Sequence, residues 1–220
     1  RCSAARAYLW PALRRRNLTV WTGANVRRVL LEGKRTVGVE VERGGETLNV
    51  AAESEVILSA GAYHSPQLLM LSGIGPPARL APHGIEVKHT LPGVGGNLQD
   101  HFGSFVQHRC TEPVTYYNLR KPAGLAAAAL RFAFTGGGPL AVFPINAMAF
   151  VRSDPRLERP YLQFYLFPSA VNPNREGDPW PRFHGYNIHW CALRPEARGH
   201  LKLRSADPKD CACDFTGVRT

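Results

Sequence analysis

The chain has 220 residues, of which 44% are hydrophobic and 20% charged. This balance excludes an intrinsically disordered chain and leaves enough apolar side chains for a buried core. The longest apolar run, residues 124–130, is too short to cross a bilayer, so we expect no transmembrane segment. Five cysteines are too few for a disulfide scaffold and favour a reducing, cytoplasmic location, although the compartment stays open. Because the chain starts with Arg1 and not Met, we expect a piece of a longer protein.

The charge of the chain is strongly positive, with 27 Lys and Arg against 17 Asp and Glu, a net charge of +10. Such a charge leaves a nucleic-acid binder open. However, only Arg14–Arg16 form a run, and no RRM, KH, zinc-finger or leucine-zipper pattern accompanies them. We therefore interpret the arginines as a solvated surface and expect no nucleic-acid partner, since net charge alone supports that alternative.

The first fifty residues predict a helix, a strand and then an antiparallel meander. The helix is predicted over residues 3–16, with Ser3 as its N-cap, and the strand over residues 18–21. The alternating Val37, Val39 and Val41, and the Gly44-Gly45 turn that follows, are typical of antiparallel strands with one wet face. The three strands of the meander are predicted over residues 26–31, 36–42 and 47–51.

A different pattern occupies residues 55–75. The apolar run Val56–Leu58 ends in small residues and predicts a strand over residues 55–60, covered on both faces as in a parallel α/β sheet. A helix is predicted from Pro66, capped by Ser65 and ended by Gly73. Ligands of open α/β sheets bind beyond such strand ends, so the turn is a candidate ligand site. An ordinary strand–turn–helix packing unit explains the same residues.

After His101 the pattern becomes that of an antiparallel sheet. An Ala-rich helix is predicted over residues 123–134 and is broken at Gly136. Strands rich in aromatic or β-branched residues are predicted over residues 105–109, 146–151, 161–167, 186–193 and 201–204. Strands separated by irregular loops favour an α+β unit. We therefore expect an α+β chain with domains 1–100 and 101–220.

Common metal and catalytic motifs are missing from the sequence. His184 and His189 are spaced to lie on opposite faces of a regular strand, and Cys211-Ala212-Cys213 lacks a second Cys or His pair. Residues 93–98 depart from the dinucleotide fingerprint, because Leu98 takes the place of its last glycine and no helix follows. We expect no metal site and assign no catalytic residue within the chain.

One segment carries a specific family resemblance. Residues 61–75, Gly-Ala-Tyr-His-Ser-Pro-Gln-Leu-Leu-Met-Leu-Ser-Gly-Ile-Gly, resemble the second signature of the glucose-methanol-choline (GMC) flavoprotein oxidoreductases. Residues 92–101, Pro-Gly-Val-Gly-Gly-Asn-Leu-Gln-Asp-His, are similar to the next block of that family. Later blocks are matched by residues 194–199 and 203–208, and the helix before the meander by residues 1–13.

The resemblance implies an FAD enzyme that oxidises alcohols by passing a hydride to the flavin, with a C-terminal histidine as base. Residues 1–100 would be part of an FAD-binding α/β domain with a β-meander, and residues 101–220 part of a substrate-binding domain with an antiparallel sheet. The family's G-x-G-x-x-G finger lies before these residues and its catalytic histidine pair after them. We therefore expect a central fragment that is inactive alone and holds FAD weakly.

The expected partner is a small-molecule alcohol, and the electron acceptor stays open. A second reading of the same chain is a non-catalytic module that keeps the fold and binds a small molecule or a partner.

The resemblance also implies individual roles. Val26 matches the position whose backbone meets the adenine of FAD, although a plain sheet residue is the alternative reading. Ala60 and Gly61 match the small strand end that lies against the cofactor. Asn97 and His101 match the loop near the flavin and the substrate entrance.

Asn146 bears on the choice of substrate. It stands where choline-oxidising members have an acidic residue that faces the quaternary ammonium. An amide cannot supply that charge, so we expect that choline is not the preferred substrate.

Overall fold

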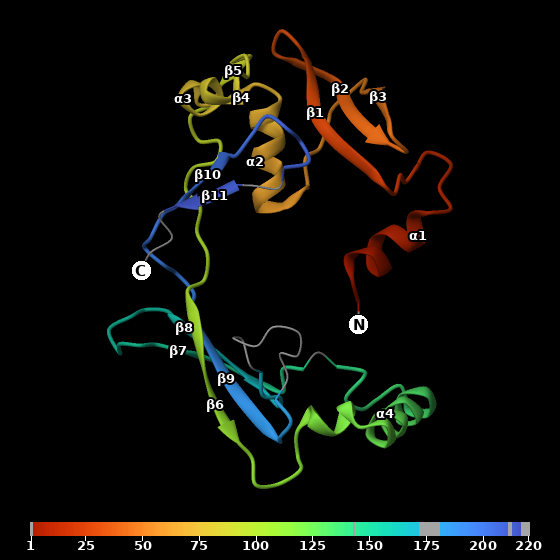
Figure 1. Cartoon of the computed structure of the whole chain (residues 1–220), viewed down its shortest axis with the longest axis vertical. Helices are drawn as coiled ribbons and strands as arrows, with labels where there is room; N and C mark the ends of the chain where they lie inside the picture. Colours follow the sequence, from red (N-terminus) through yellow and green to blue (C-terminus); the bar gives the residue numbers. More distant parts are fainter. Residues whose placement is uncertain (1, 143, 172–180, 211–212, 217–220) are drawn as a thin grey trace. The chain divides into compact units, whose positions relative to one another are not determined.

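The computed structural model describes residues 2–142, 144–171, 181–210 and 213–216. The chain divides into two compact units (Figure 1). The meander unit comprises Ala4–Asp100 and Glu196–Thr220, and the sheet unit comprises His101–Pro195 together with Arg1–Ser3. Relative to the expected domains 1–100 and 101–220, the last 25 residues, Glu196–Thr220, belong with the first part of the chain.

The N-terminal segment is less regular than its sequence predicts. A π-helical turn, η1 (Ala5–Leu9), continues into the short α1 (Trp10–Ala12), so the helix expected over residues 3–16 is confirmed only in its middle. The strand predicted over residues 18–21 is wrong, and the side chains of Leu18, Val20 and Trp21 are exposed. A strand is stable only when its backbone pairs, and within the described residues nothing pairs with this segment.

The antiparallel meander is confirmed. Strands β1 (Ala24–Glu32), β2 (Arg35–Arg43) and β3 (Glu46–Ala51) form a sheet in the order β1-β2-β3. Gly44 and Gly45 have φ of 60° and 86°, the left-handed backbone that a tight hairpin turn requires.

The two faces of the meander differ in polarity. Val29 and Val41 are buried. Ion pairs join Arg27 to Glu40 and Glu42 at 3.2 and 3.0 Å, and Arg28 to Glu40 at 2.7 Å. Two of the arginines that contribute to the positive net charge are therefore paired on the sheet surface.

The helix after the meander begins earlier than expected. Helix α2 (Gly61–Leu71) starts at Gly61 instead of Pro66, which lies inside it. Ser65 is not its N-cap, because the Ser65 hydroxyl accepts a hydrogen bond from the Ala60 amide at 3.1 Å. The predicted end is confirmed: Gly73 has φ of 83°, and a Cβ there would lie 2.5 Å from the Glu86 carbonyl oxygen.

The strand predicted over residues 55–60 is wrong. This segment has no regular structure, and Ile57 is exposed. The apolar run lacks a hydrogen-bonded neighbour among the described residues, and an unpaired apolar run has no ladder to hold it extended. Parallel pairing in the described part of the chain is limited to β4 (Ile74–Gly75) with β5 (His89–Thr90).

The core of the meander unit explains why residues after 195 belong to it. Met70 of α2 and Leu80 of α3 (Pro77–Leu80) are fully buried and form one cluster with Val94 and Leu203. Leu203 comes from β10 (His200–Leu203), which pairs with β11 (Cys213–Thr216). The strand predicted over residues 201–204 thus completes this core instead of extending the sheet of the second half. A short 3-10 turn, η2 (Ala81–His83), follows α3.

The sheet unit follows its prediction closely. Its antiparallel sheet has the order β6-β9-β8-β7. The strands are β6 (Gly103–Arg109), β7 (Ala147–Val151), β8 (Leu162–Phe167) and β9 (Gly185–Ala192). Between β6 and β7 lie the 3-10 segment η3 (Tyr116–Arg120) and α4 (Pro122–Thr135), which Gly136 ends with φ of 64°.

The fold class is therefore mixed α and β with antiparallel sheets, as expected in outline. Its assignment to FAD-binding and substrate-binding domains stays a prediction. None of the helices in the described ranges combines the length and the apolarity that a membrane span needs.

Candidate functional site

A cleft of about 490 Å³ lies in front of α2 in the meander unit. One wall is formed by Ala62, Ser65, Pro66 and Leu69 of α2, and the other by the loop of residues 93–99 together with Leu201. We call it the α2 cleft. Its walls combine two segments that the sequence had singled out, the turn after residue 60 and the glycine-rich loop after residue 92.

Small residues keep the α2 cleft open. A Cβ at Gly61 or Gly93 would meet nothing within 4 Å. A Cβ at Gly95 would instead lie 2.7 Å from the Leu201 carbonyl oxygen and 2.8 Å from Nη1 of Arg79, and its φ is 72°. Only glycine fits at this position.

The loop is also held by hydrogen bonds. Arg79 Nη1 donates to the Val94 carbonyl at 2.8 Å, and the Leu201 amide donates to the Gly95 carbonyl at 2.7 Å. Asn97, with φ of 56°, continues this left-handed path. The rim of the cleft is thus a fixed stretch of backbone.

The start of α2 supplies hydrogen-bond donors at the cleft. The first amides of a helix lack intrahelical acceptors and carry the positive end of its dipole. Ala60 precedes the helix and gives it no side-chain cap. Backbone donors beside an open space lined by small residues fit a ligand rich in carbonyl or phosphate oxygens, which includes a flavin nucleotide. The residues present therefore fit FAD.

One of the predicted cofactor residues, Asn97, lines the α2 cleft. Ala60 is the N-cap of α2 and Gly61 its first residue, so both directly precede the lining residue Ala62, but neither is itself among the residues that line the cleft. Val26 lies elsewhere in the same unit, on β1 opposite Val41 and next to a β-bulge. It is half-buried and is not among the residues that line the α2 cleft, so its proposed contact with adenine stays a prediction.

The two remaining predicted residues belong to the sheet unit. His101 is exposed, and its Nδ1 lies 3.9 Å from Sγ of Cys191. Asn146 precedes β7, donates its amide to the Leu166 carbonyl at 3.0 Å and accepts a hydrogen bond from the Tyr116 hydroxyl at 3.3 Å.

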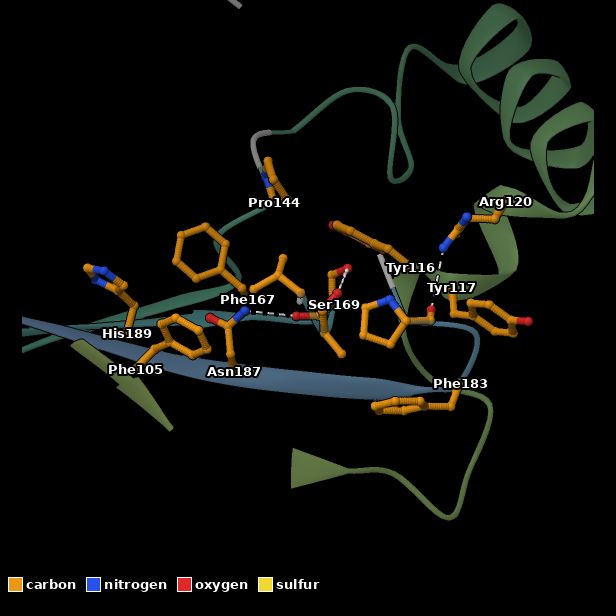
Figure 2. A pocket seen from close by; sticks show the side chains of 13 residues that line it. Phe105, Tyr116, Tyr117, Arg120, Pro144, Phe167, Ser169, Phe183, Asn187 and His189 are labelled. Carbon is orange, nitrogen blue, oxygen red and sulfur yellow. Dashed lines mark hydrogen bonds between the residues drawn. The ribbon is translucent and has the colours of Figure 1, made fainter. Parts of the chain in front are cut away.

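A second cavity, of about 540 Å³, lies within the sheet unit and was missed by the sequence reasoning. Figure 2 shows its wall of rings, to which β6, β8, η3 and the segment before β9 contribute. These rings belong to Phe105, Tyr116, Tyr117, Phe167 and Phe183. We call it the aromatic cavity. Asn146 is not one of the lining residues, but its side chain accepts a hydrogen bond from the hydroxyl of the lining residue Tyr116.

The register of the sheet explains how this wall arises. Phe105 pairs with His189, and His189 pairs with Tyr165, so the three side chains share one face. Phe167 and Asn187 are paired on the same face. The ring centroids of Phe167 and His189 lie 6.5 Å apart, and those of Tyr165 and His189 lie 5.9 Å apart. The period-2 alternation of strands predicts such a face once the pairing is known, but not before.

Polar groups at this cavity are mostly engaged. The Asn187 side-chain amide donates to the Ser169 carbonyl at 3.0 Å, and the Val171 amide donates to the Gln107 side chain at 2.7 Å. Beside the cavity, partial burial raises the pKa of Tyr165 above its ordinary value, and the Cys191 thiol adds to the effect. The Tyr165 hydroxyl therefore stays protonated at neutral pH.

Metal ligation has no support in the described ranges, which hold no group of three or more His, Cys, Asp or Glu side chains arranged for an ion. Cys211 and Ala212 of the C-x-C sequence lie outside the described residues. His184 instead bonds to the Thr115 hydroxyl at 3.0 Å.

Known structures share this fold. A formate oxidase matches with a TM-score of 0.80 and 26% identity, over 89% of this chain and 39% of that one. Pyridoxine 4-oxidase from Mesorbium loti matches with a TM-score of 0.76 and 28% identity, over 98% of this chain and 38% of that one. The fold is therefore one that this chain shares with oxidases, among them a formate oxidase of Aspergillus oryzae whose FAD is modified.

Curated sequences and a family model narrow this class. An oxygen-dependent choline dehydrogenase of Brucella anthropi is 44% identical over 213 residues, which are 96% of this chain and 38% of the relative. One of Photobacterium profundum is 42% identical over 94% of this chain and 36% of its own length. Residues 1–103 match the model of the GMC oxidoreductases. The resemblance to the GMC oxidoreductases, a family of FAD-dependent flavoproteins, is confirmed: residues 1–103 match that family, and the chain spans less than half the length of these relatives.

Proposed function

We propose that this chain supplies cofactor-facing and substrate-facing parts of a flavoprotein that oxidises the CH–OH group of an alcohol. The observation that carries the proposal is the α2 cleft, because the family match and an open, donor-lined space coincide at the same residues. The relatives named choline dehydrogenase and pyridoxine 4-oxidase support an alcohol as the substrate class. FAD, when bound, would accept the hydride from the carbinol carbon.

The chain's own residues have defined tasks in this proposal. The backbone at Ala60 and Gly61 and the rim at Asn97 hold and orient the cofactor through hydrogen bonds. Val26 offers its main-chain groups to the adenine, and His101 lies near the flavin and the substrate entrance. The small side chains in the wall of the α2 cleft leave room for a planar ring system, whereas a larger side chain would fill that space.

The 220 residues by themselves are proposed to be inactive. No stretch among them matches the G-x-G-x-x-G finger or the catalytic histidine pair of the family, and no side chain here is assigned as the base that takes the hydroxyl proton. FAD binding and alcohol turnover are thus separable in this chain, and binding is the property to measure.

Choline is proposed not to be the preferred substrate. The relatives named for choline are similar over most of this chain. However, Asn146 supplies an uncharged amide, already bonded to Tyr116, where a carboxylate would face an ammonium group.

An FAD titration of the whole chain, followed by quenching of flavin fluorescence, tests the proposal. We expect weak, saturable binding that Ala62→Phe abolishes because the new ring fills the α2 cleft. The matched control, Ala129→Phe, places the same ring on the exposed surface of α4 and should bind like the parent. Absence of any FAD binding, or equal binding by both variants, would overturn the proposal and favour the non-catalytic module.

A further inference from the structure

The aromatic cavity has the size and the lining of a small-molecule site. Its volume of about 540 Å³ falls within the range of roughly 300–1,000 Å³ that ligand pockets occupy. Five aromatic rings line it, together with few polar groups, and the sheet under it is a rigid hydrogen-bonded floor. Apolar walls on a rigid support favour a ligand with a flat or apolar body, because rings pack edge-to-face or offset against other rings.

The charges around the rings argue against a cation. Nζ of Lys121 lies 5.6 Å from the ring centroid of Tyr117, and Cζ of Arg109 lies 5.3 Å from that of Phe183. These rings therefore already attract cations of the chain itself. No carboxylate is found among the described residues that line the cavity. A quaternary ammonium placed here would meet like charges and no compensating anion.

The polar groups at the cavity are neutral apart from Arg120, which lines it and donates from Nη1 to the Pro181 carbonyl at 3.4 Å. The Tyr116 hydroxyl donates to Oδ1 of Asn146, and the Asn187 amide donates to the Ser169 carbonyl, as drawn in Figure 2 for the second pair. Such groups orient an uncharged ligand without demanding a charge from it.

We infer that the aromatic cavity binds the uncharged ring or apolar body of the alcohol substrate and discriminates against quaternary ammonium alcohols. The inference rests on the proposed function for calling the ligand a substrate, and it deepens that function by naming the substrate class. The discrimination comes from Arg120 in the lining and from Arg109 and Lys121 beside the rings, and the affinity comes from the rings themselves.

Ligand-observed NMR on the whole chain without FAD tests the inference, with benzyl alcohol and choline as probes. Benzyl alcohol should bind, and choline should bind at least tenfold more weakly. Phe167→Ala removes a wall ring and should weaken benzyl alcohol about fivefold to tenfold. Phe167→Leu, which keeps the strand packed, should lie between that variant and the parent. The control is Phe134→Ala on α4, a side chain 84% exposed and outside the cavity, which should change nothing.

Two results would overturn the inference. One is choline binding as tightly as benzyl alcohol, and the other is an equal effect of the Phe167 and Phe134 substitutions. Because the probes are measured without FAD, these failures are distinct from a failure of the FAD titration, which concerns the α2 cleft alone.

Discussion

The α2 cleft is lined by glycines, Ala62 and aliphatic side chains but by no aromatic ring, whereas the aromatic cavity is lined by large rings. In the first, shape comes from the path of the main chain, and Gly95 has no tolerated substitute. In the second, shape comes from side chains that stand on a regular sheet. A site made of backbone suits a cofactor that a whole family shares, while a site made of side chains can change its ligand by a few substitutions.

Because the backbone of the α2 cleft is supported by a buried core, a substitution in that core should destabilise the protein more than one on an exposed helix. Leu80 is fully buried in the cluster that supports the glycine-rich loop. Leu80→Ala should lower the free energy of unfolding by about 2–5 kcal/mol, since it removes apolar contacts and leaves a cavity. The same change at Leu130 of α4, 59% exposed, should cost less than about 0.5 kcal/mol. Denaturant unfolding followed by circular dichroism measures both, and equal losses would contradict the described core.

The rim of the α2 cleft should be the next most sensitive position. Gly95→Ala forces a Cβ against the Leu201 carbonyl and keeps a left-handed backbone, so we expect a loss of about 1–3 kcal/mol together with weaker FAD binding. Gly44→Ala shares the positive φ but meets nothing within 4 Å, and should cost about 1 kcal/mol with FAD binding kept. Unfolding curves and the FAD titration read out this pair. If Gly95→Ala changed neither the stability nor the FAD binding, the rim would not depend on glycine at this position.

In the aromatic cavity, by contrast, one side chain should retune the ligand. Asn146→Glu places a carboxylate beside the Tyr116 hydroxyl and should raise choline affinity about tenfold, the factor that 1.4 kcal/mol provides. Asn146→Gln keeps the amide and serves as the control, for which no gain is expected. Ligand-observed NMR compares the two, and identical choline binding would break the argument from charge.

The smallest expected effect concerns pH and the surface of the meander unit. Lys209, followed by Arg27, holds the pKa of Glu42 below its ordinary value. The folded unit thus takes up this proton less readily than the unfolded chain. The stabilisation is present above the ordinary glutamate pKa and is lost as the pH falls through the lowered one.

Removing the lysine tests this sign. Lys209→Met should flatten the acid-induced loss of stability slightly, whereas Lys202→Met, also exposed on the meander unit, should leave it unchanged. Thermal unfolding between neutral and acidic pH measures the slope, and a steeper acid loss in Lys209→Met would contradict the assignment.

Local sequence signals predicted correctly those strands and helices whose pattern or end is marked by residues close by in the chain. The meander, α4 and the four strands of the sheet unit follow from alternation, β-propensity and glycine breaks. The strands predicted over residues 18–21 and 55–60 were wrong because β-propensity does not provide the neighbouring strand with which a strand must pair. The placement of β10 was wrong for a related reason: an apolar residue such as Leu203 indicates burial, but the sequence does not say which residues it packs against.

The two sites differ in the same way. The two segments that form most of the walls of the α2 cleft, residues 61–75 and 92–101, could each be singled out from the sequence because each is contiguous and matches a family pattern. The aromatic cavity could not, because its rings are scattered from Phe105 to Phe183 and converge only through strand register and the turn η3. An aromatic residue in a strand signals a sheet, and which rings face each other depends on pairing.

The most direct test of the account is amide hydrogen exchange of the whole chain with and without FAD in large excess. FAD should protect the backbone amides at the start of α2, from Gly61 to Ser65, and in the loop of residues 93–98, and should leave α4 unchanged. Protection confined to other segments, with these two stretches exchanging as fast as in the absence of FAD, would contradict the placement of the flavin nucleotide in the α2 cleft.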